Sequence, residues 1–162
     1  MDSRVQIQSE DFDMARIYTE LRVQAAGHAG AIVTFVGLVR DHNALAGDGA
    51  DVDALVLEHY PGMTERSISA ILDQAQTRWP VSGLRVVHRV GELLPRDQIV
   101  LVAAASAHRA AAFAAAEFVM DYLKTDAVLW KREHTRLGRT WLKSTSQDAA
   151  RVDKWHESDG LT

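Results

Sequence analysis

The chain has 162 residues, of which 47% are apolar and 25% are charged, and its formal net charge is −4. This length supports one substantial core, so we predict a single domain at residues 1–145 followed by a polar tail at residues 146–162. The absence of cysteine excludes disulfides, zinc–thiolate sites, iron–sulfur clusters and thiol catalysis. The net negative charge argues against general nucleic-acid binding.

No segment has the length and composition expected of a membrane span or a secretory signal. The longest apolar run, residues 30–39, is about half as long as a membrane-spanning helix. Residues 1–12 alternate polar and apolar types and contain no continuous hydrophobic stretch. We therefore expect a soluble, cytoplasmic protein that does not bind membranes.

In the first third of the chain, the apolar pattern predicts one helix and two strands. Residues 11–23 predict a short amphipathic helix with Asp11 as its cap. Residues 31–39 are nearly all apolar and predict a strand that is covered on both faces. A polar loop is expected at residues 41–51, and residues 52–59 predict the second strand.

The remainder of the chain predicts two further helices and four further strands. One helix is capped by Thr64 and ends at Pro80, and a long alanine-rich helix follows the cap Ser106. The long helix covers residues 107–124, and the strands cover residues 84–90, 98–106, 128–133 and 140–143. Strands come both as adjacent pairs and separated by helices, so the predicted class is α+β.

Two groups of cations in this pattern are candidates for binding an anion. His108 and Arg109 lie where a strand passes into a helix, so free backbone N–H groups and the helix dipole could join their side chains in an anion pocket. Arg40 follows a buried strand and could be held rigidly while the next loop closes over a ligand. The alternative is that all three are ordinary solvated residues.

Lys124 and Lys131 are the candidates for chemistry. Residues 124–143 contain six Lys or Arg and two Asp or Glu, a local balance of +4. Two neighbouring ammonium groups disfavour each other's charged form, so one could be neutral and act as a base or nucleophile. The alternative is a helix-end lysine favoured by the dipole, together with an exposed strand lysine. The seven histidines show no helical pairing, and no metal site is predicted.

Several ordered segments between Gly30 and Lys143 together resemble the large subunit of molybdopterin synthase. Any one of them would mean little, whereas the ordered set is specific. The segments are Gly30-Ala-Ile-Val-Thr-Phe-Val-Gly-Leu-Val-Arg40, Leu57-Glu-His-Tyr-Pro-Gly-Met63, His88-Arg-Val-Gly-Glu92, Ser106-Ala-His-Arg109 with Ala112-Phe113, Met120-Asp-Tyr-Leu-Lys-Thr125 and Trp130-Lys-Arg-Glu133.

The resemblance implies an α/β-hammerhead type of α+β fold with an additional small antiparallel β-sheet. It also implies a homodimer of large subunits within a heterotetramer, in which each carries a small ubiquitin-like sulfur-carrier subunit. The carrier's Gly-Gly C-terminus, as a thiocarboxylate, would give sulfur to cyclic pyranopterin monophosphate and so form the dithiolene of molybdopterin. No cofactor is expected. A chain without cysteine agrees with this, because its sulfur must arrive from elsewhere.

Family roles carried over by position make Lys124 and Lys131 the catalytic lysines. The substrate-pocket positions are Leu38, Val39, Arg40, His108, Arg109, Arg132 and Glu133. Leu38 stands where the family often has a basic residue, and Val128-Leu129 replaces a Pro-aromatic pair. Both departures affect the expected pocket.

As a mechanism, we expect Arg40, His108 and Arg109 to hold the substrate phosphate. Lys131 would stabilise the anion formed as sulfur attacks the pterin side chain, and Lys124 would be a base, a proton donor or a partner of the thiocarboxylate or the acyl intermediate. This requires the lysines and the cations at the helix start to share one cavity, within one copy or across a dimer. Two competing hypotheses are a binding module for phosphate ligands or a carrier protein, and a purely structural domain.

Overall fold

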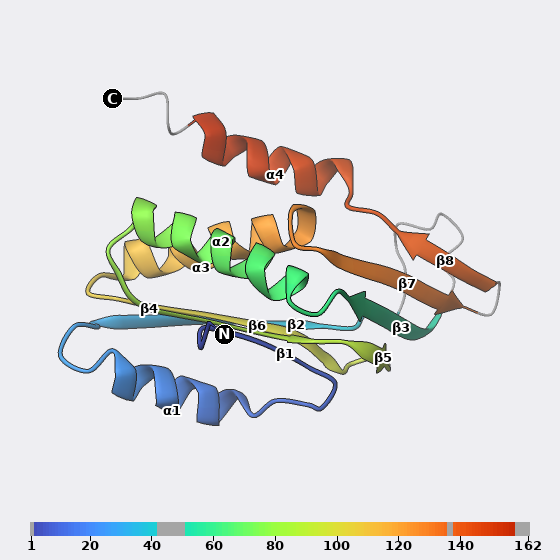
Figure 1. Ribbon diagram of the computed structural model, residues 1–162, viewed down its shortest axis with the longest axis horizontal. Coiled ribbons are helices and arrows are strands. Elements are labelled where there is room, and N and C mark those ends of the chain that lie inside the picture. Colours follow the sequence, from blue (N-terminus) through green and yellow to red (C-terminus); the bar gives the residue numbers. More distant parts are fainter. Residues whose placement is uncertain (1, 42–50, 136–137, 158–162) are drawn as a thin grey trace.

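The structure is a computed structural model that describes residues 2–41, 51–135 and 138–157 (Figure 1). Most of the predicted loop at residues 41–51 lies outside the described residues. The elements are β1 (Val5–Gln8), α1 (Met14–Gln24), β2 (Ala31–Leu38), β3 (Val52–His59), α2 (Met63–Arg78), β4 (Val81–Arg89), β5 (Gly91–Leu93), β6 (Gln98–Ser106), α3 (Arg109–Thr125), β7 (Leu129–Thr135), β8 (Gly138–Leu142) and α4 (Ser146–Glu157).

The larger structural unit is a four-stranded sheet in the order β1-β4-β6-β2. β1 is parallel to β4, while β4 and β2 are both antiparallel to β6. The central strand β6 is covered on both faces, and this burial explains why its sequence is a continuous apolar run. Leu101 and Ala103 pack on one side of the sheet, and Val100 and Val102 pack on the other.

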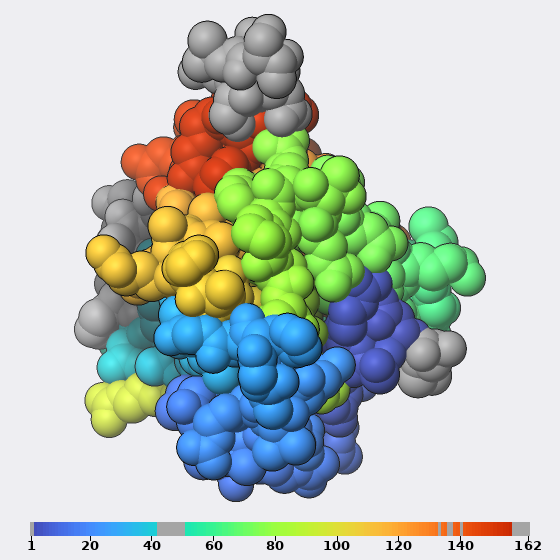
Figure 2. Space-filling view, turned by 90° about the vertical axis from the view of Figure 1, so that its left-hand side faces the viewer, coloured from blue at the N-terminus to red at the C-terminus, as the bar shows by residue number. Residues whose placement is uncertain are grey.

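Helices cover both faces of this sheet. α1 lies on one face and inserts Ile17 and Leu21 into the core. α2 and α3 cover the opposite face, and α4 lies over them (Figure 1). Figure 2 shows the same stack from one end, from α1 at the bottom to α4 near the top. Among the helices in the described ranges, none is long and apolar enough to cross a membrane.

The second sheet is entirely antiparallel, with the order β5-β3-β7-β8. Its inner face forms a small apolar cluster of Val39, Leu55, Leu57 and Leu93, against which Ile99 of the larger sheet packs. The sheet therefore joins the end of the larger sheet. The α+β class with an additional small antiparallel sheet is confirmed.

All three predicted helix caps are wrong, and those of α1 and α3 were replaced through tertiary contacts. The side chain that accepts hydrogen bonds from the first turn of α1 belongs to Asp13, whereas Asp11 bonds to the side chain of Gln98. Ser106 is fully buried and donates to the carbonyl of Pro80 at 2.9 Å, while His108 occupies the N-cap of α3 without a side-chain cap bond. In both cases several polar residues precede the helix, and tertiary contacts decide which of them is the cap.

The C-terminal segment was expected to be a polar tail, but residues 146–157 form α4 and pack on α3. Val152 is 9% exposed and joins the main core. The buried carboxylate of Asp121 on α3 accepts hydrogen bonds of 2.8 Å from both Arg151 and Trp155 on α4. α4 therefore belongs to the same domain. Its few apolar residues gave little sequence signal: Val152 belongs to the core cluster and Trp155 packs against it.

Candidate active site

Lys131 lies near the middle of β7, on the face that points into the molecule. Its register partners are Leu57 on β3 and Leu142 on β8, and both belong to or pack against the inner apolar cluster. Cross-strand partners share a face of a sheet, so the stem of Lys131 follows this apolar surface. Burial lowers the pKa of Lys131, and the nearby charge of Lys124 lowers it further. The predicted effect of one lysine on the other is present.

Lys124 reaches the same region from the last turn of α3. Its Nζ lies 3.5 Å from Oδ1 of Asp148, near the start of α4. The side chain of Lys124 is 51% exposed, whereas that of Asp148 is 15% exposed. The charge of Asp148 acts on Lys131 as well and partly opposes the lowering of its pKa. One carboxylate therefore influences both lysines.

The segment between the two lysines is fixed by α2. The hydroxyl of Thr64 is fully buried and donates to the carbonyl of Val128 at 2.7 Å, and the N–H of Val128 donates to the hydroxyl of Ser67 at 3.3 Å. Thr64 was predicted to cap α2, but the N-cap is Gly62, whose N–H donates to the side chain of Glu65. Because proline has no N–H, the bond from Val128 to Ser67 requires a residue other than proline at this position, as this chain has.

One histidine near Lys131, His88, was missed by the sequence interpretation. His88 on β4 is 4% exposed, and its Nδ1 lies 2.8 Å from the carbonyl oxygen of Arg89. Burial lowers the pKa of His88 to about 4, with smaller contributions from the charges of Lys131 and His59. His88 is therefore neutral near pH 7 and adds a polar group without adding charge. The only sequence signal was its position in one of the family-like segments.

Arg132 points away from Lys131, because successive residues of a strand alternate between its faces. Its guanidinium lies 3.7 Å from Glu58 and over the ring of Trp141, with 5.2 Å between the guanidinium carbon and the ring centroid. Its Nε is buried and has no hydrogen-bond partner among the described residues. These contacts place Arg132 on the outer face of the second sheet and not on the face of Lys131. The next residue, Glu133, pairs in register with Leu55 on β3.

The three adjacent candidates at the end of β2 have different surroundings. Leu38 is 54% exposed and Arg40 is also exposed, at the end of the larger sheet where Leu38 pairs with Gln98. Val39 is 4% exposed and packs in the inner cluster of the second sheet. Its N–H and C=O are both hydrogen-bonded to the turn at residues 96–97. The structure gives Val39 a packing role.

His108 and Arg109 lie at the opposite end of the same sheet. Ala31, the first residue of β2, pairs with Ser106, and His108 follows two residues later. The fifteen-residue separation of Arg109 and Lys124 along α3 corresponds to roughly 22 Å of helix. A cavity that joins all the predicted cations within one copy of the chain is therefore excluded. Of the candidate side chains that the structure describes, Lys124 and Lys131 are the two whose charges act on each other.

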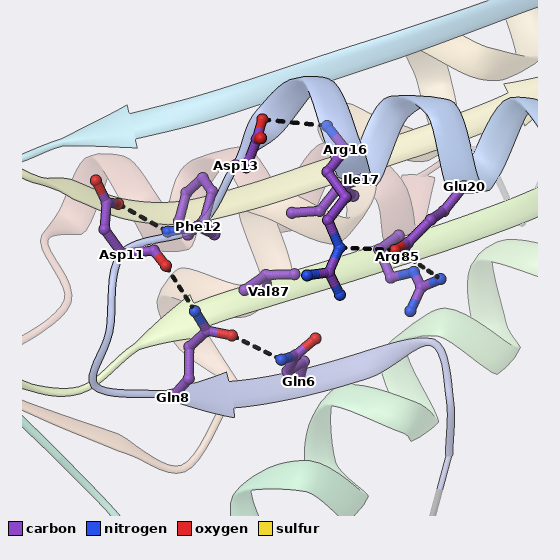
Figure 3. Close-up of a pocket in the computed structure, with 10 residues that line it drawn as sticks. All are labelled: Gln6, Gln8, Asp11, Phe12, Asp13, Arg16, Ile17, Glu20, Arg85 and Val87. Carbon is purple, nitrogen blue, oxygen red and sulfur yellow. Dashed lines mark hydrogen bonds and ion pairs between the residues drawn. The ribbon is translucent and has the colours of Figure 1, made fainter.

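A separate polar pocket of about 90 Å³ lies on the other face of the larger sheet, between β1, β4 and α1 (Figure 3). Its charged groups are paired with each other: Glu20 lies 2.9 Å from Arg16 and 3.7 Å from Arg85. Asp13 of the same pocket caps α1. These contacts hold α1 on the sheet, and the pocket takes no part in the lysine site.

The fold and the paired lysines define an α+β protein equipped to act on an anionic substrate, with a partly buried lysine whose proton affinity is reduced. The chain belongs to the MoaE protein family, whose model matches residues 7–126. The family predicted from the sequence is confirmed. Lys131 lies just beyond the matched residues, so full-length relatives are needed to cover the whole site.

Such relatives cover nearly the whole chain. The molybdopterin synthase catalytic subunit of Vibrio cholerae is 52% identical over 155 residues, which are 96% of this chain and 99% of that protein. The structure of molybdopterin cofactor biosynthesis protein E from Burkholderia multivorans has a TM-score of 0.79 and 45% identity, over 96% of this chain and 98% of that one. A molybdopterin synthase from Staphylococcus aureus has a TM-score of 0.76 and 28% identity, over 88% and 98%.

Proposed function

We propose that this chain is the catalytic subunit of a molybdopterin synthase and acts as a sulfurtransferase. It would take sulfur from the thiocarboxylated C-terminus of a small carrier subunit and transfer it to cyclic pyranopterin monophosphate. The observation that carries the proposal is the meeting of Lys124 and Lys131, in which burial and a second ammonium group reduce the proton affinity of Lys131. The relatives named as catalytic subunits support the same activity.

The site suits a reaction in which the protein supplies charge and proton transfer but no sulfur. With no cysteine in the chain, the attacking sulfur is that of the carrier's thiocarboxylate. When that sulfur bonds to a carbon of the pterin side chain, a C–O bond of the same carbon would break and the oxygen would leave with the electron pair. The ammonium of Lys131 would stabilise this negative charge in a partly buried setting. Water would then hydrolyse the thioester that joins carrier and pterin, which releases the carrier as a carboxylate and leaves a thiolate on the pterin, and a second thiocarboxylated carrier would repeat the transfer to give the two sulfurs of the dithiolene.

Lys124 is better placed for the exposed side of the site. Its side chain is half-exposed and already faces one carboxylate, Asp148. A carrier tail that arrives with a terminal thiocarboxylate would meet the same ammonium group. We therefore assign Lys124 to the carrier tail and to proton transfer, and Lys131 to the pterin. Arg40, which lies at the same end of the larger sheet, is a candidate for the substrate phosphate.

His108 and Arg109 enter this proposal only through a second copy of the chain. They lie too far from Lys124 to act in the same copy, and β2 is the edge strand of its sheet, with Phe35 42% exposed. A twofold dimer would bring the start of one α3 to the lysines of its partner. A complementation experiment tests this with a mixed dimer, in which one copy carries Lys131→Ala and the other carries Arg109→Ala. If each site takes its lysines from one copy and its cations from the other, one site of the mixed dimer loses both residues and the second site keeps both.

In that experiment, the two inactive variants are co-expressed with separable tags, and the mixed dimer is purified. If the cations act across the dimer, each mixed dimer keeps one intact site and about half of the wild-type activity returns. A mixed dimer that stays inactive would reject a site formed by residues from two copies of the chain.

The activity itself is tested with purified chain, thiocarboxylated carrier and cyclic pyranopterin monophosphate, with the dithiolene pterin as the measured product. Lys124→Ala and Lys131→Ala should each reduce product formation by about a hundredfold or more. Lys143→Ala, an exposed lysine beyond β8, is the matched control and should stay within about twofold. Product formation within a few-fold of wild type in Lys124→Ala would remove its catalytic assignment.

A binding module that holds the carrier or a phosphate ligand without turnover is the second candidate. It needs the cations but neither lysine as a reactive group. The same mixture discriminates the two functions, since a binding module would yield a complex and no dithiolene. A purely structural domain would show no phosphate-dependent rise in melting temperature.

A further inference from the structure

The carboxylate of Asp148 has two separate sets of partners. Oδ2 accepts hydrogen bonds from the N–H and the hydroxyl of Thr145, at 2.8 and 2.9 Å. The N–H of Asp148 returns a bond of 3.2 Å to the hydroxyl of Thr145, which completes a capping box at the start of α4. The remaining oxygen, Oδ1, lies 3.5 Å from Nζ of Lys124. A helix cap thus aims one oxygen at a lysine on another helix.

We propose that Asp148 is a positioning residue of the synthase reaction, which holds the ammonium of Lys124 at the entrance of the site. This inference rests on the proposed function of Lys124. A long, half-exposed lysine has many rotamers, and a fixed carboxylate reduces the entropy that must be lost when the side chain meets its substrate. The carboxylate of Asp148 is itself held in place by its hydrogen bonds with Thr145 in the capping box.

The position of Asp148 depends in turn on how α4 is anchored. One turn after the box, Arg151 donates to the buried Asp121 of α3, and Trp155 donates to the other oxygen of the same carboxylate. Asp121 lies one turn before Lys124 on α3. The anchor and the lysine therefore share a rigid helix, so the docking of α4 determines where the carboxylate of Asp148 lies relative to Lys124.

The charges around the site explain why a carboxylate is useful there. Lys124 from α3, Lys131 from β7, Asp148 from α4, His88 from β4 and His59 from β3 are the titratable groups that interact there. Asp148 alone among these five carries negative charge, so it reduces the repulsion between the lysines. Burial opposes its charge, but the bonds from Thr145 and the charge of Lys124 outweigh burial, and the pKa of Asp148 lies below its usual value. It therefore stays charged near pH 7.

The test compares Asp148→Asn with Asp148→Glu and with Asp153→Asn, an exposed change of the same charge on the same helix. Asparagine keeps an acceptor for Thr145 but loses the charge. We expect kcat/KM to fall by about fivefold to twentyfold in Asp148→Asn. Glutamate is also a favoured third residue of a capping box, so Asp148→Glu should recover most of the loss. Asp153→Asn should stay within about twofold of wild type.

A second readout separates positioning from simple loss of structure. In Asp148→Asn the pKa of Lys131 should fall, because the carboxylate that opposed its lowering is gone. Nitrogen-15 NMR of the lysine side chains in the purified protein should show that Lys131 titrates at lower pH than in wild type. The corresponding limb of the pH–activity profile should move in the same direction. Melting temperatures of the three variants show whether they are folded.

The outcomes distinguish this inference from the proposed function. Absence of product from wild type rejects the proposed function, whatever the NMR titration shows. If wild type is active but Asp148→Asn retains its kcat/KM and leaves the titration of Lys131 unchanged, the positioning role is wrong. A loss of activity that Asp148→Glu does not recover, with Lys131 unmoved, also contradicts it.

Discussion

Replacing Asp121 by asparagine should loosen α4 from the rest of the protein. Asp121 is 5% exposed, and its two oxygens accept 2.8 Å bonds from Arg151 and Trp155. A hydrogen bond to a charged group contributes about 1.5–3 kcal/mol, and the half-exposed guanidinium of Arg151 places its bond near the lower end. Asparagine keeps one acceptor, so the expected loss of stability is about 2 kcal/mol. For a chain of this size, that lowers the melting temperature by about 4–8 °C.

The matched control is Glu117→Gln, one turn earlier on the same helix. Glu117 is 45% exposed and contacts Arg151 and Lys154 of α4, and Lys154 also lies 3.4 Å from Asp121. An exposed ion pair of this kind should contribute less than about 0.5 kcal/mol. Urea denaturation gives the two stabilities, and hydrogen exchange of the α4 amides reports whether the helix opens locally. Equal losses in the two variants, with unchanged exchange in α4, would refute the assignment of the anchor to Asp121.

Three further changes test other contacts. Thr64→Val removes the buried bond to Val128 and should reduce stability by about 1–3 kcal/mol in urea denaturation, with a loss of activity as the segment before Lys131 shifts. Gly30→Ala places a methyl group against the carbonyl oxygen of Ala107, a backbone atom that cannot rotate away, and should cost about 1–3 kcal/mol. Between about pH 7.5 and pH 5, the wild-type protein should lose about 2 kcal/mol more stability than His88→Asn.

The sign of the last effect follows from the histidine itself. His88 has a folded pKa of about 4 against 6.5 for the free side chain, so its protonation favours the unfolded chain. The stability it contributes is complete above pH 6.5 and is lost as the pH falls toward 4. The exposed His28→Asn is the control, and Thr77→Val, an exposed threonine on the same helix, is the control for Thr64→Val. Equal effects in a variant and its control would contradict the corresponding prediction.

Part of the site was predictable because it depends on local sequence. Lys124 closes a helix whose apolar residues recur at helical spacing, and Lys131 follows Leu129 and Trp130 in a predicted strand, so the approximate placement of both lysines followed from the local sequence. Their approach to each other needed more than spacing, because α2 fixes the segment between them through Val128. The carboxylate beside Lys124 comes from residue 148, in a segment whose polar sequence gave no sign of such a contact.

The sequence by itself determined the α+β class, the boundaries of β3 and β6, and the family, because each depends on residues close together in the chain or on ordered local segments. Only the tertiary structure decided that β1 pairs with β4, that α4 docks on Asp121, and that Arg109 lies roughly 22 Å from Lys124. These depend on contacts between distant segments, whose energies come from packing and buried hydrogen bonds that no local pattern encodes.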